Sequence, residues 1–448
     1  MTAVITLRLK TAALFFVAVV LLAFSPAPAQ ATKIEKVVSP GGIEAWLVQD
    51  HLNPIISLRL AWHGGSSLDP DGKEGLANMV STLLDEGAAE LDSKAFQQTL
   101  EDNSITLRFD AGRDSFGARL QTLTENRDLA FDLLRKAMTA PRFDKEPVDR
   151  LRTQILAQLR REQEQADAVA GKTLMAALYP NHPYGRPTAG TQQSVAGLTV
   201  DDLRHFVSER LARDTLAIGV VGNITPKELA RLLDETFGAL PAKAAPWKIP
   251  QAKPQVDGRT IVIDKPVRQS NILFADQGLM RKDPDFYTAF VMNHVLGGGG
   301  FTSRLYSEVR DKRGLAYSVY TYLNPMEFSA VYVGGAGTAN ARVSETLDVL
   351  RKEWTRMAEN GVTEDELTAA KQYLTGSFPL RFTSTSRIAS MLVGMQMEDL
   401  GIDYLDKRNS FIEAVSQDDI RRVSRKLLHP ERLTVVVVGQ PENVKASQ

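Results

Sequence analysis

Two side chains late in the sequence have types and a spacing that could act on a carbonyl group. Arg310 and Tyr317 lie seven positions apart. A guanidinium and a phenol can both donate hydrogen bonds to a carbonyl oxygen and to the oxyanion that develops when a nucleophile attacks it. A structural alternative stays open, in which Arg310 pairs with a carboxylate on its own helix and Tyr317 packs in a strand.

The sequence indicates no metal site. It has no cysteine, and its histidines include no pair at the i, i+3 or i, i+4 spacing that places two ligands on one helical face. The histidines occupy positions 51, 63, 182, 205, 294 and 429. The run Asp69-Pro70-Asp71-Gly72 begins like a calcium loop, but the later acidic ligands and the closing glutamate are misplaced. We interpret the run as a turn and expect no metal ion to be bound by this chain.

A glycine-rich loop precedes the Arg310–Tyr317 pair. It does not read as a phosphate loop, because its glycines follow a helical pattern and no Gly-Lys-Ser/Thr comes after them. Glycine lets another backbone approach closely. Gly298, Gly299 and Gly300 therefore either admit another backbone or merely end the preceding helix.

The elements that must position these residues recur in the same order in two halves. Each half opens with two strand patterns, continues with a helical pattern and closes on a β-branched strand that ends in glycine. In the first half these patterns lie at residues 43–48, 55–62, 73–84 and 216–222. In the second half they lie at residues 260–263, 271–275, 285–296 and 433–439. This repetition indicates a duplication.

The predicted fold class is α+β, with two tandem homologous halves that are each a sandwich of sheet and helices. Long helical patterns at residues 146–164 and 364–378 lie between the strands. The Pro- and Lys-rich stretch 241–258 suits an extended linker. It separates an N-terminal domain, residues 32–240, from a C-terminal domain, residues 259–448.

The N-terminus predicts export. Arg8 and Lys10 precede an apolar run at residues 11–24, and Ala29-Gln30-Ala31 supplies the small residues of a cleavage site. The run is shorter than the roughly 20 residues of a spanning helix, so residues 1–31 are predicted to be a signal peptide rather than an anchor. Cleavage changes the formal charge from -1 to -3. We expect a bacterial periplasmic protein that does not bind nucleic acid.

The segment at residues 64–87 resembles the insulinase/pitrilysin peptidases, or inverzincins, which carry Gly-Leu-Ala-His-x-x-Glu-His in such a helix. In that family the two histidines hold zinc and the glutamate takes a proton from the metal-bound water. Here the histidine slots are Asn78 and Thr82, and the glutamate slot is Ser81. None of the three can perform its role, because amide and hydroxyl oxygens are poor zinc ligands and serine is no base near neutral pH.

The resemblance also implies a third zinc ligand, a glutamate on a downstream helix. The corresponding slot falls between Gln158 and Glu164. Glu162 or Glu164 in that slot, together with one asparagine, would not hold zinc.

The segment at residues 296–322 resembles the family's signature in the half without zinc. There an arginine and a tyrosine reach into the zinc site of the facing half, and the matching positions are Arg310 and Tyr317. The loop at Gly298–Gly300 is similar to that of the non-catalytic subunit of processing peptidases, which handles substrate. The resemblance therefore implies a clam-shaped heterodimer, in which this chain positions peptides for a partner homologue that carries zinc.

Two other functions stay open. The first is a structural or peptide-binding protein with the same fold and no part in proteolysis. The second is an independent hydrolase that uses Ser81 as its nucleophile, which is disfavoured because the local sequence places no histidine or lysine base beside it.

Overall fold

The computed structural model describes residues 33–447, and residues from Lys36 onward form one compact unit. The predicted signal peptide, residues 1–31, lies outside the described residues. No helix within the described part of the chain has both the length and the apolar character that a membrane crossing requires.

The first half contains a six-stranded sheet in the order β1-β2-β6-β3-β5-β4. Strands β2 and β6 are parallel, and β6, β3, β5 and β4 pair antiparallel with their neighbours. The strands are β1 (Glu35–Val38), β2 (Glu44–Gln49), β3 (Ile55–His63), β4 (Thr106–Ala111), β5 (Ser115–Leu123) and β6 (Leu216–Gly222).

The second half contains a five-stranded sheet in the order β7-β11-β8-β10-β9. Its one parallel pair is β7 with β11, and the other neighbours are antiparallel. The strands are β7 (Thr260–Asp264), β8 (Gln269–Gln277), β9 (Ala316–Pro325), β10 (Ala330–Ala339) and β11 (Thr434–Gly439). Apart from β1, the two sheets share one strand order and one pattern of directions. The predicted strands are confirmed, and the common topology is what a duplication produces.

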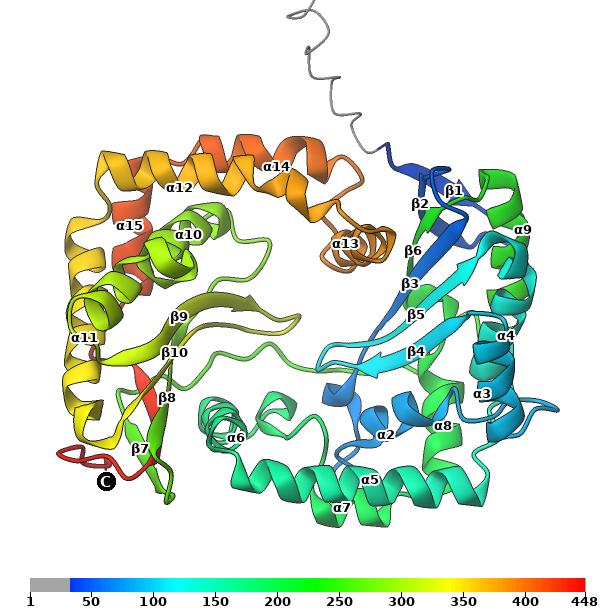
Figure 1. Cartoon of the computed structure of the whole chain (residues 1–448), viewed down its shortest axis with the longest axis horizontal. Helices are drawn as coiled ribbons and strands as arrows, with labels where there is room; N and C mark the ends of the chain where they lie inside the picture. The colour runs from blue at the N-terminus through cyan, green and yellow to red at the C-terminus, as the bar shows by residue number, and fades with distance from the viewer. Residues whose placement is uncertain (1–32, 448) are drawn as a thin grey trace, which may run out of the picture. The chain divides into compact units, whose positions relative to one another are not determined.

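Helices cover one face of each sheet, and an apolar core fills the space between (Figure 1). In the first half the helices are α2 (Leu76–Leu83), α3 (Ser93–Asp102), α4 (Arg127–Thr139), α5 (Lys145–Glu164), α6 (Ala166–Leu178), α7 (Gln192–Gly197), α8 (Val200–Arg210) and α9 (Pro226–Phe237). In the second half they are α10 (Phe286–Asn293), α11 (Val343–Asn360), α12 (Glu364–Gly376), α13 (Thr385–Met397), α14 (Tyr404–Glu413) and α15 (Gln417–Leu427). The predicted α+β class with two sandwich halves is confirmed.

One helix of each half packs against the sheet of the other half. Helix α6 packs on β8 and β11 of the second sheet, and α13 packs on β3 and β6 of the first. The second sheet is apolar on this outer face too, and its valines there share a cluster with Leu174 and Leu178 of α6. Strand β11 is therefore buried on both faces, which explains its continuous run of valines. Helix α13 lies so close to β6 that a Cβ at Gly219 would meet the Ala389 carbonyl at 2.6 Å.

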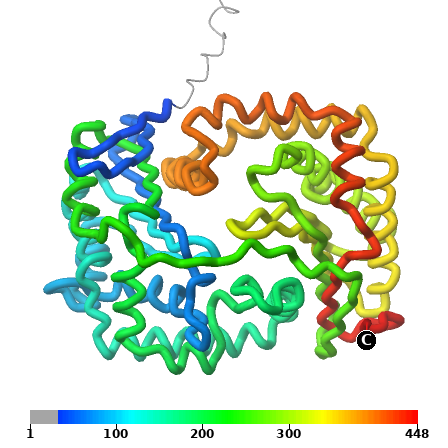
Figure 2. Tube along the Cα trace, turned by 180° about the vertical axis from the view of Figure 1, so that it is seen from behind, coloured from blue at the N-terminus to red at the C-terminus, as the bar shows by residue number. Residues whose placement is uncertain are grey.

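Residues 238–259 join α9 to β7 without forming a helix or a strand, and Figure 2 shows them crossing from one half to the other. Helix α10 ends earlier than the helical pattern at residues 285–296 predicted. The α-helix stops at Asn293, and a π-helical turn, η5 (His294–Gly298), leads into the glycine-rich loop. A second π-helical turn, η7 (Tyr306–Asp311), follows that loop. Hydrophobic periodicity does not distinguish these wider turns from an α-helix.

Candidate functional site

The segment that precedes α2, residues 69–75, caps the N-terminal end of this helix. The buried Asp69 carboxylate accepts hydrogen bonds from the backbone N–H groups of Gly75 at 2.8 Å and Ala77 at 3.0 Å, at the start of the helix. Burial raises the pKa of Asp69 to about 7, although these hydrogen bonds act in the opposite direction. Asp71 pairs with Arg186 at 2.7 Å. The sequence Asp69–Gly72 thus serves as a turn, as predicted.

Two of the three degenerate positions on α2, Ser81 and Thr82, form side-chain hydrogen bonds within their own helix. The Ser81 hydroxyl donates to the Asn78 carbonyl at 2.8 Å, and the Thr82 hydroxyl donates to the Met79 carbonyl at 2.9 Å. Ser81 is buried, at 5% exposure. Within residues 33–447 its hydroxyl bonds to the Asn78 carbonyl, which cannot act as a general base. The geometry gives no support to Ser81 as a nucleophile.

The carboxylates in the region of the predicted third slot are engaged by lysines. Helix α5 packs against α2, but Glu162 pairs with Lys172 at 2.7 Å and Glu164 pairs with Lys265 at 3.1 Å. Burial raises the pKa of Glu162, yet its hydrogen bonds to Lys172 and Gln158 outweigh this and leave the pKa below its ordinary value. Among the described residues, no three His, Cys, Asp or Glu side chains gather where they could hold a metal ion. The residues at the family's zinc position do not fit that metal.

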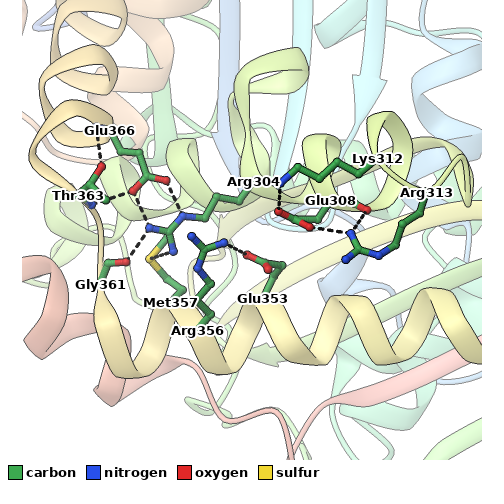
Figure 3. Close-up of polar contacts among 10 residues, drawn as sticks. All are labelled: Arg304, Glu308, Lys312, Arg313, Glu353, Arg356, Met357, Gly361, Thr363 and Glu366. Atoms are coloured by element: carbon green, nitrogen blue, oxygen red, sulfur yellow. Dashed lines mark hydrogen bonds and ion pairs between the residues drawn. The ribbon is translucent and has the colours of Figure 1, made fainter.

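Arg310 and Tyr317 lie together. The Arg310 guanidinium donates to the Tyr317 carbonyl at 3.0 Å and lies 4.6 Å from the centre of its ring. Of the two carboxylates on the same turn, Glu308 is held by Lys312 and Arg313, each at 2.6 Å (Figure 3), and Asp311 forms no ion pair with any described residue. The alternative in which Arg310 pairs with a carboxylate of its own helix is therefore wrong. The same alternative placed Tyr317 in a strand, and Tyr317 does lie in β9, but it is 77% exposed rather than packed.

A β-bulge gives Tyr317 this exposure. Along β9, Ser318 pairs with Gly337 and Ala316 pairs with Thr338, so Tyr317 is the extra residue between two ladder positions. Strict alternation would place Tyr317 on the buried face, because side chains two apart in a strand share a face and Val319 is buried. The bulge redirects the phenol toward solvent beside Arg310.

The structural constraint that favours glycine differs between Gly298, Gly299 and Gly300. A Cβ at Gly298 would lie 2.3 Å from the Asn293 amide nitrogen, and one at Gly299 would lie 2.6 Å from the His294 carbonyl oxygen. Tight internal packing therefore accounts for Gly298 and Gly299. Gly300 has a φ of 58°, and no atom would lie within 4 Å of its Cβ. Of the three, Gly300 leaves open space for another backbone.

Arg304 anchors the end of this loop. Its guanidinium makes two hydrogen bonds to the Glu366 carboxylate, at 2.7 and 2.6 Å, and a third to the Gly361 carbonyl at 2.9 Å (Figure 3). Glu366 also accepts from the backbone N–H of Thr363, completing the capping box of α12. The arginine in the Ser303-Arg304-Leu305-Tyr306 part of the signature is thus structural. It fixes where η7 begins, and with it the position of Arg310.

Strand β9 presents further tyrosines that the sequence analysis missed. Tyr320 and Tyr322 are 42% and 45% exposed, and their rings stack with centres 6.1 Å apart. Because β9 is the edge of its sheet, its outer backbone groups have no neighbouring strand there. The alternation of Tyr320, Thr321 and Tyr322 was the available signal.

A cavity of about 1020 Å³ lies between the two halves. It is lined by the outer face of β3, β4 and β5, by α13 and by the turn between β9 and β10. At that turn His63 contacts Glu327 at 3.2 Å, and the backbone N–H of Glu327 donates to Asp114 at 3.0 Å. The hydrogen bond to Glu327 raises the pKa of His63, and burial raises the pKa of Asp114. The sequence could not indicate this cavity, since its walls come from segments far apart in the chain.

The structure leaves the two signatures apart. Asn78, Ser81 and Thr82 belong to the first half, whereas Arg310, Tyr317 and the glycines belong to the second. In the described part of the chain, the Arg310 side chain bonds to the Tyr317 carbonyl and lies against the rings of Tyr317 and Tyr306. One chain therefore does not assemble both signatures into one site.

Comparisons with known proteins identify both halves. The model "Insulinase (Peptidase family M16)" matches residues 45–192, and the model "Peptidase M16 inactive domain" matches residues 197–374. The non-peptidase homolog YmxG of Helicobacter pylori is 30% identical over 334 residues, which are 74% of this chain and 77% of that protein. An uncharacterized zinc protease of Streptomyces coelicolor is 26% identical over 93% of this chain and 91% of its own.

A solved structure is similar throughout. The crystal structure of a peptidase M16 inactive domain from Pseudomonas fluorescens superposes with a TM-score of 0.86 at 28% identity, covering 93% of this chain and all of that one. The family resemblance on which the sequence analysis rests is confirmed. The chain belongs to the insulinase family of peptidases, family M16, as an inactive member in which the zinc-binding positions have been replaced.

Proposed function

We propose that this chain is the zinc-less, substrate-holding subunit of a heterodimeric metalloendopeptidase, exported to the bacterial periplasm by its N-terminal segment. The observation that carries the proposal is the contrast between the two signatures. All three motif positions of the zinc helix are replaced, and the hydroxyls of Ser81 and Thr82 bond within that helix, whereas the Arg310–Tyr317 pair is preformed and accessible.

The first half argues for a partner. Asn78, Ser81 and Thr82 supply neither the ligands nor the base that activate water in this family. Hydrolysis is therefore assigned to a homologue that carries the His-x-x-Glu-His motif and its zinc. The fold of such a homologue would face this chain with its own first half.

The second half argues for contact with substrate. A β-bulge exposes Tyr317, and the guanidinium of Arg310 lies over its ring, so both polar groups are oriented before a peptide arrives. From these positions Arg310 and Tyr317 would donate hydrogen bonds to a peptide carbonyl and to the oxyanion formed from it. Gly300 and the edge strand β9 offer backbone contacts beside them.

The test begins with a pull-down of the tagged mature chain from its native host, followed by zinc analysis and peptide cleavage on the eluate. We expect a His-x-x-Glu-His homologue to co-purify, about one zinc per heterodimer, and no cleavage by the chain alone. Arg310→Ala should lower kcat of the heterodimer by roughly 10²-fold, the loss typical of a removed oxyanion donor. Tyr317→Phe removes one donor and should lower kcat by about tenfold or more.

Matched controls separate this loss from general damage. Arg421→Ala removes an exposed arginine paired with Asp418, and Tyr373→Phe removes one hydroxyl from a tyrosine that is 62% exposed. Neither control should change kcat. Cleavage by the chain alone after chelator treatment, lost on Arg310→Ala, would contradict the division of labour.

A peptide-binding or structural protein without a role in proteolysis is the second candidate. Internal packing accounts for Gly298 and Gly299, and the cavity between the halves offers room for a peptide that is held but not cleaved. Peptide binding without a zinc-bearing partner, unaffected by Arg310→Ala and Tyr317→Phe, would favour this function.

A further inference from the structure

Four side chains form a continuous stack from the glycine-rich loop to Arg310 and Tyr317. The ring of Phe301 meets the ring of Tyr306 edge to face, with centres 4.9 Å apart and an interplanar angle of 81°. The Arg310 guanidinium lies 4.8 Å from the Tyr306 ring centre and 4.6 Å from that of Tyr317. Distances and angles of this kind are those of favourable aromatic pairs and cation–π contacts.

The local structure makes Tyr306 the central member. Tyr306 begins the π-helical turn η7, and Arg310 follows it by four residues on the same turn. Only 9% of Tyr306 is exposed, whereas Phe301, at the tip of the loop, is 75% exposed. A buried ring therefore connects an accessible ring on one side to a guanidinium on the other.

Arg310 depends on these rings for its position. Of the two carboxylates on its own turn, Glu308 is held by Lys312 and Arg313, and no ion pair joins Arg310 to Asp311 or to any other residue among 33–447. A guanidinium has considerable rotamer freedom, and one hydrogen bond to a carbonyl restricts it only partly. The faces of Tyr306 and Tyr317 supply the remaining restraint.

We propose that Phe301 and Tyr306 are positioning residues that couple the glycine-rich loop to the Arg310–Tyr317 pair. A peptide side chain that rests on Phe301 would shift the loop, and the Phe301–Tyr306 contact would carry this shift to the guanidinium of Arg310. The exposed ring suits apolar or aromatic side chains of the peptide, and the open space at Gly300 gives its backbone room. This inference rests on the proposed function, because it assumes that peptides reach the loop.

The first experiment needs no partner and no activity. In the full mature chain with ¹⁵N-labelled arginine, the side-chain Nε–H resonance of Arg310 is assigned by its loss in Arg310→Lys. Stacking on two rings should shift this resonance upfield. Tyr306→Phe keeps the ring and should preserve the shift, whereas Tyr306→Leu should remove much of it. An Arg310 resonance that is the same in Tyr306→Leu as in the wild type would overturn the proposal.

Coupling is tested by adding a non-hydrolysed peptide with one central phenylalanine, and the same peptide with serine in its place. The phenylalanine peptide should move the Arg310 resonance in the wild type, and it should bind Phe301→Ala without moving it. Equal movement in Phe301→Ala and in the wild type would show that the loop does not act through Phe301.

The heterodimer provides the kinetic readout. Tyr306→Leu should lower kcat by roughly 3- to 10-fold with little change in KM, as expected from the loss of one cation–π contact. Tyr306→Phe should restore kcat, and Phe301→Ala should raise KM for the phenylalanine peptide but not for the serine peptide. Wild-type kcat in Tyr306→Leu would contradict the positioning role. Indifference of cleavage to Arg310→Ala would instead refute the proposed function and leave the arginine spectrum as an independent test of the stack.

Discussion

Replacing Glu366 by glutamine tests whether a buried ion pair holds the glycine-rich loop in place. The Arg304 side chain is 8% exposed and that of Glu366 is 29% exposed, and two hydrogen bonds join them. Removing one partner of a buried pair costs about 3–5 kcal/mol, because the other charge stays buried without compensation. Glutamine keeps one acceptor oxygen, which can take the place of Oε2 toward Arg304 and the α12 cap, but its amide NH2 group cannot accept from Arg304 Nε. We therefore expect Glu366→Gln to lower the free energy of unfolding by about 2–3 kcal/mol.

The pH dependence of this effect has a definite sign. Burial raises the pKa of Glu366, but hydrogen bonds to Arg304 and Thr363 outweigh it, so the pKa in the folded protein lies below its ordinary value. The stabilisation is therefore fully present above the ordinary pKa of glutamate and is lost as the pH falls through the lower folded value. The difference between the wild type and Glu366→Gln should shrink at acidic pH.

The assay is urea denaturation with hydrogen exchange of the peptides that cover α11 and α12, since the two halves need not unfold together. Glu364→Gln is the matched control, because it removes the same charge from an exposed position of the same helix turn. That control should stay within about 0.5 kcal/mol of the wild type. An equally small effect of Glu366→Gln would refute the reasoning.

Three further predictions concern other contacts. Gly219→Ala should destabilise the docking of α13 by about 1–3 kcal/mol in denaturation measurements, whereas Gly394→Ala, with open space around it, should be neutral or stabilising. Asp69 has its pKa raised to about 7, so it binds protons more tightly in the folded protein, and stability should fall as the pH rises from about 4 to 7. That slope should disappear in Asp69→Asn. Histidine NMR should show that Glu327→Gln lowers the pKa of His63; the stabilisation from this pair is present at low pH and is lost as the pH rises through the raised pKa.

Local patterns predicted most of the elements of this fold. Alternation identified β3 and β8, and the β-branched runs that end in glycine identified β6 and β11. The matched order of patterns predicted the duplication before any strand pairing was visible. These signals are local because a strand or helix that buries one face must repeat its apolar residues at a fixed period.

The remainder depends on contacts that no local pattern encodes. The bulge at Tyr317 arises from pairing with β10, so alternation alone would place that side chain in the core. The stack of Phe301, Tyr306 and Arg310 depends on a π-helical turn, which has no distinct periodicity. The cavity between the halves and the opposing placement of α6 and α13 bring together residues hundreds of positions apart.

The placement of α6 and α13 bears on how the chain arose. Each helix occupies the same position in its half, α6 after α5 and α13 after α12, and each covers the sheet of the other half. A single ancestral half would have left the outer face of its own sheet bare. Two identical copies could have covered both faces by trading this helix, which is a domain-swapped dimer. Fusion of the two genes would then have made the swap permanent. We therefore expect either half, expressed alone, to be insoluble or to dimerise through the helix that packs on the other half in the full chain, α6 or α13.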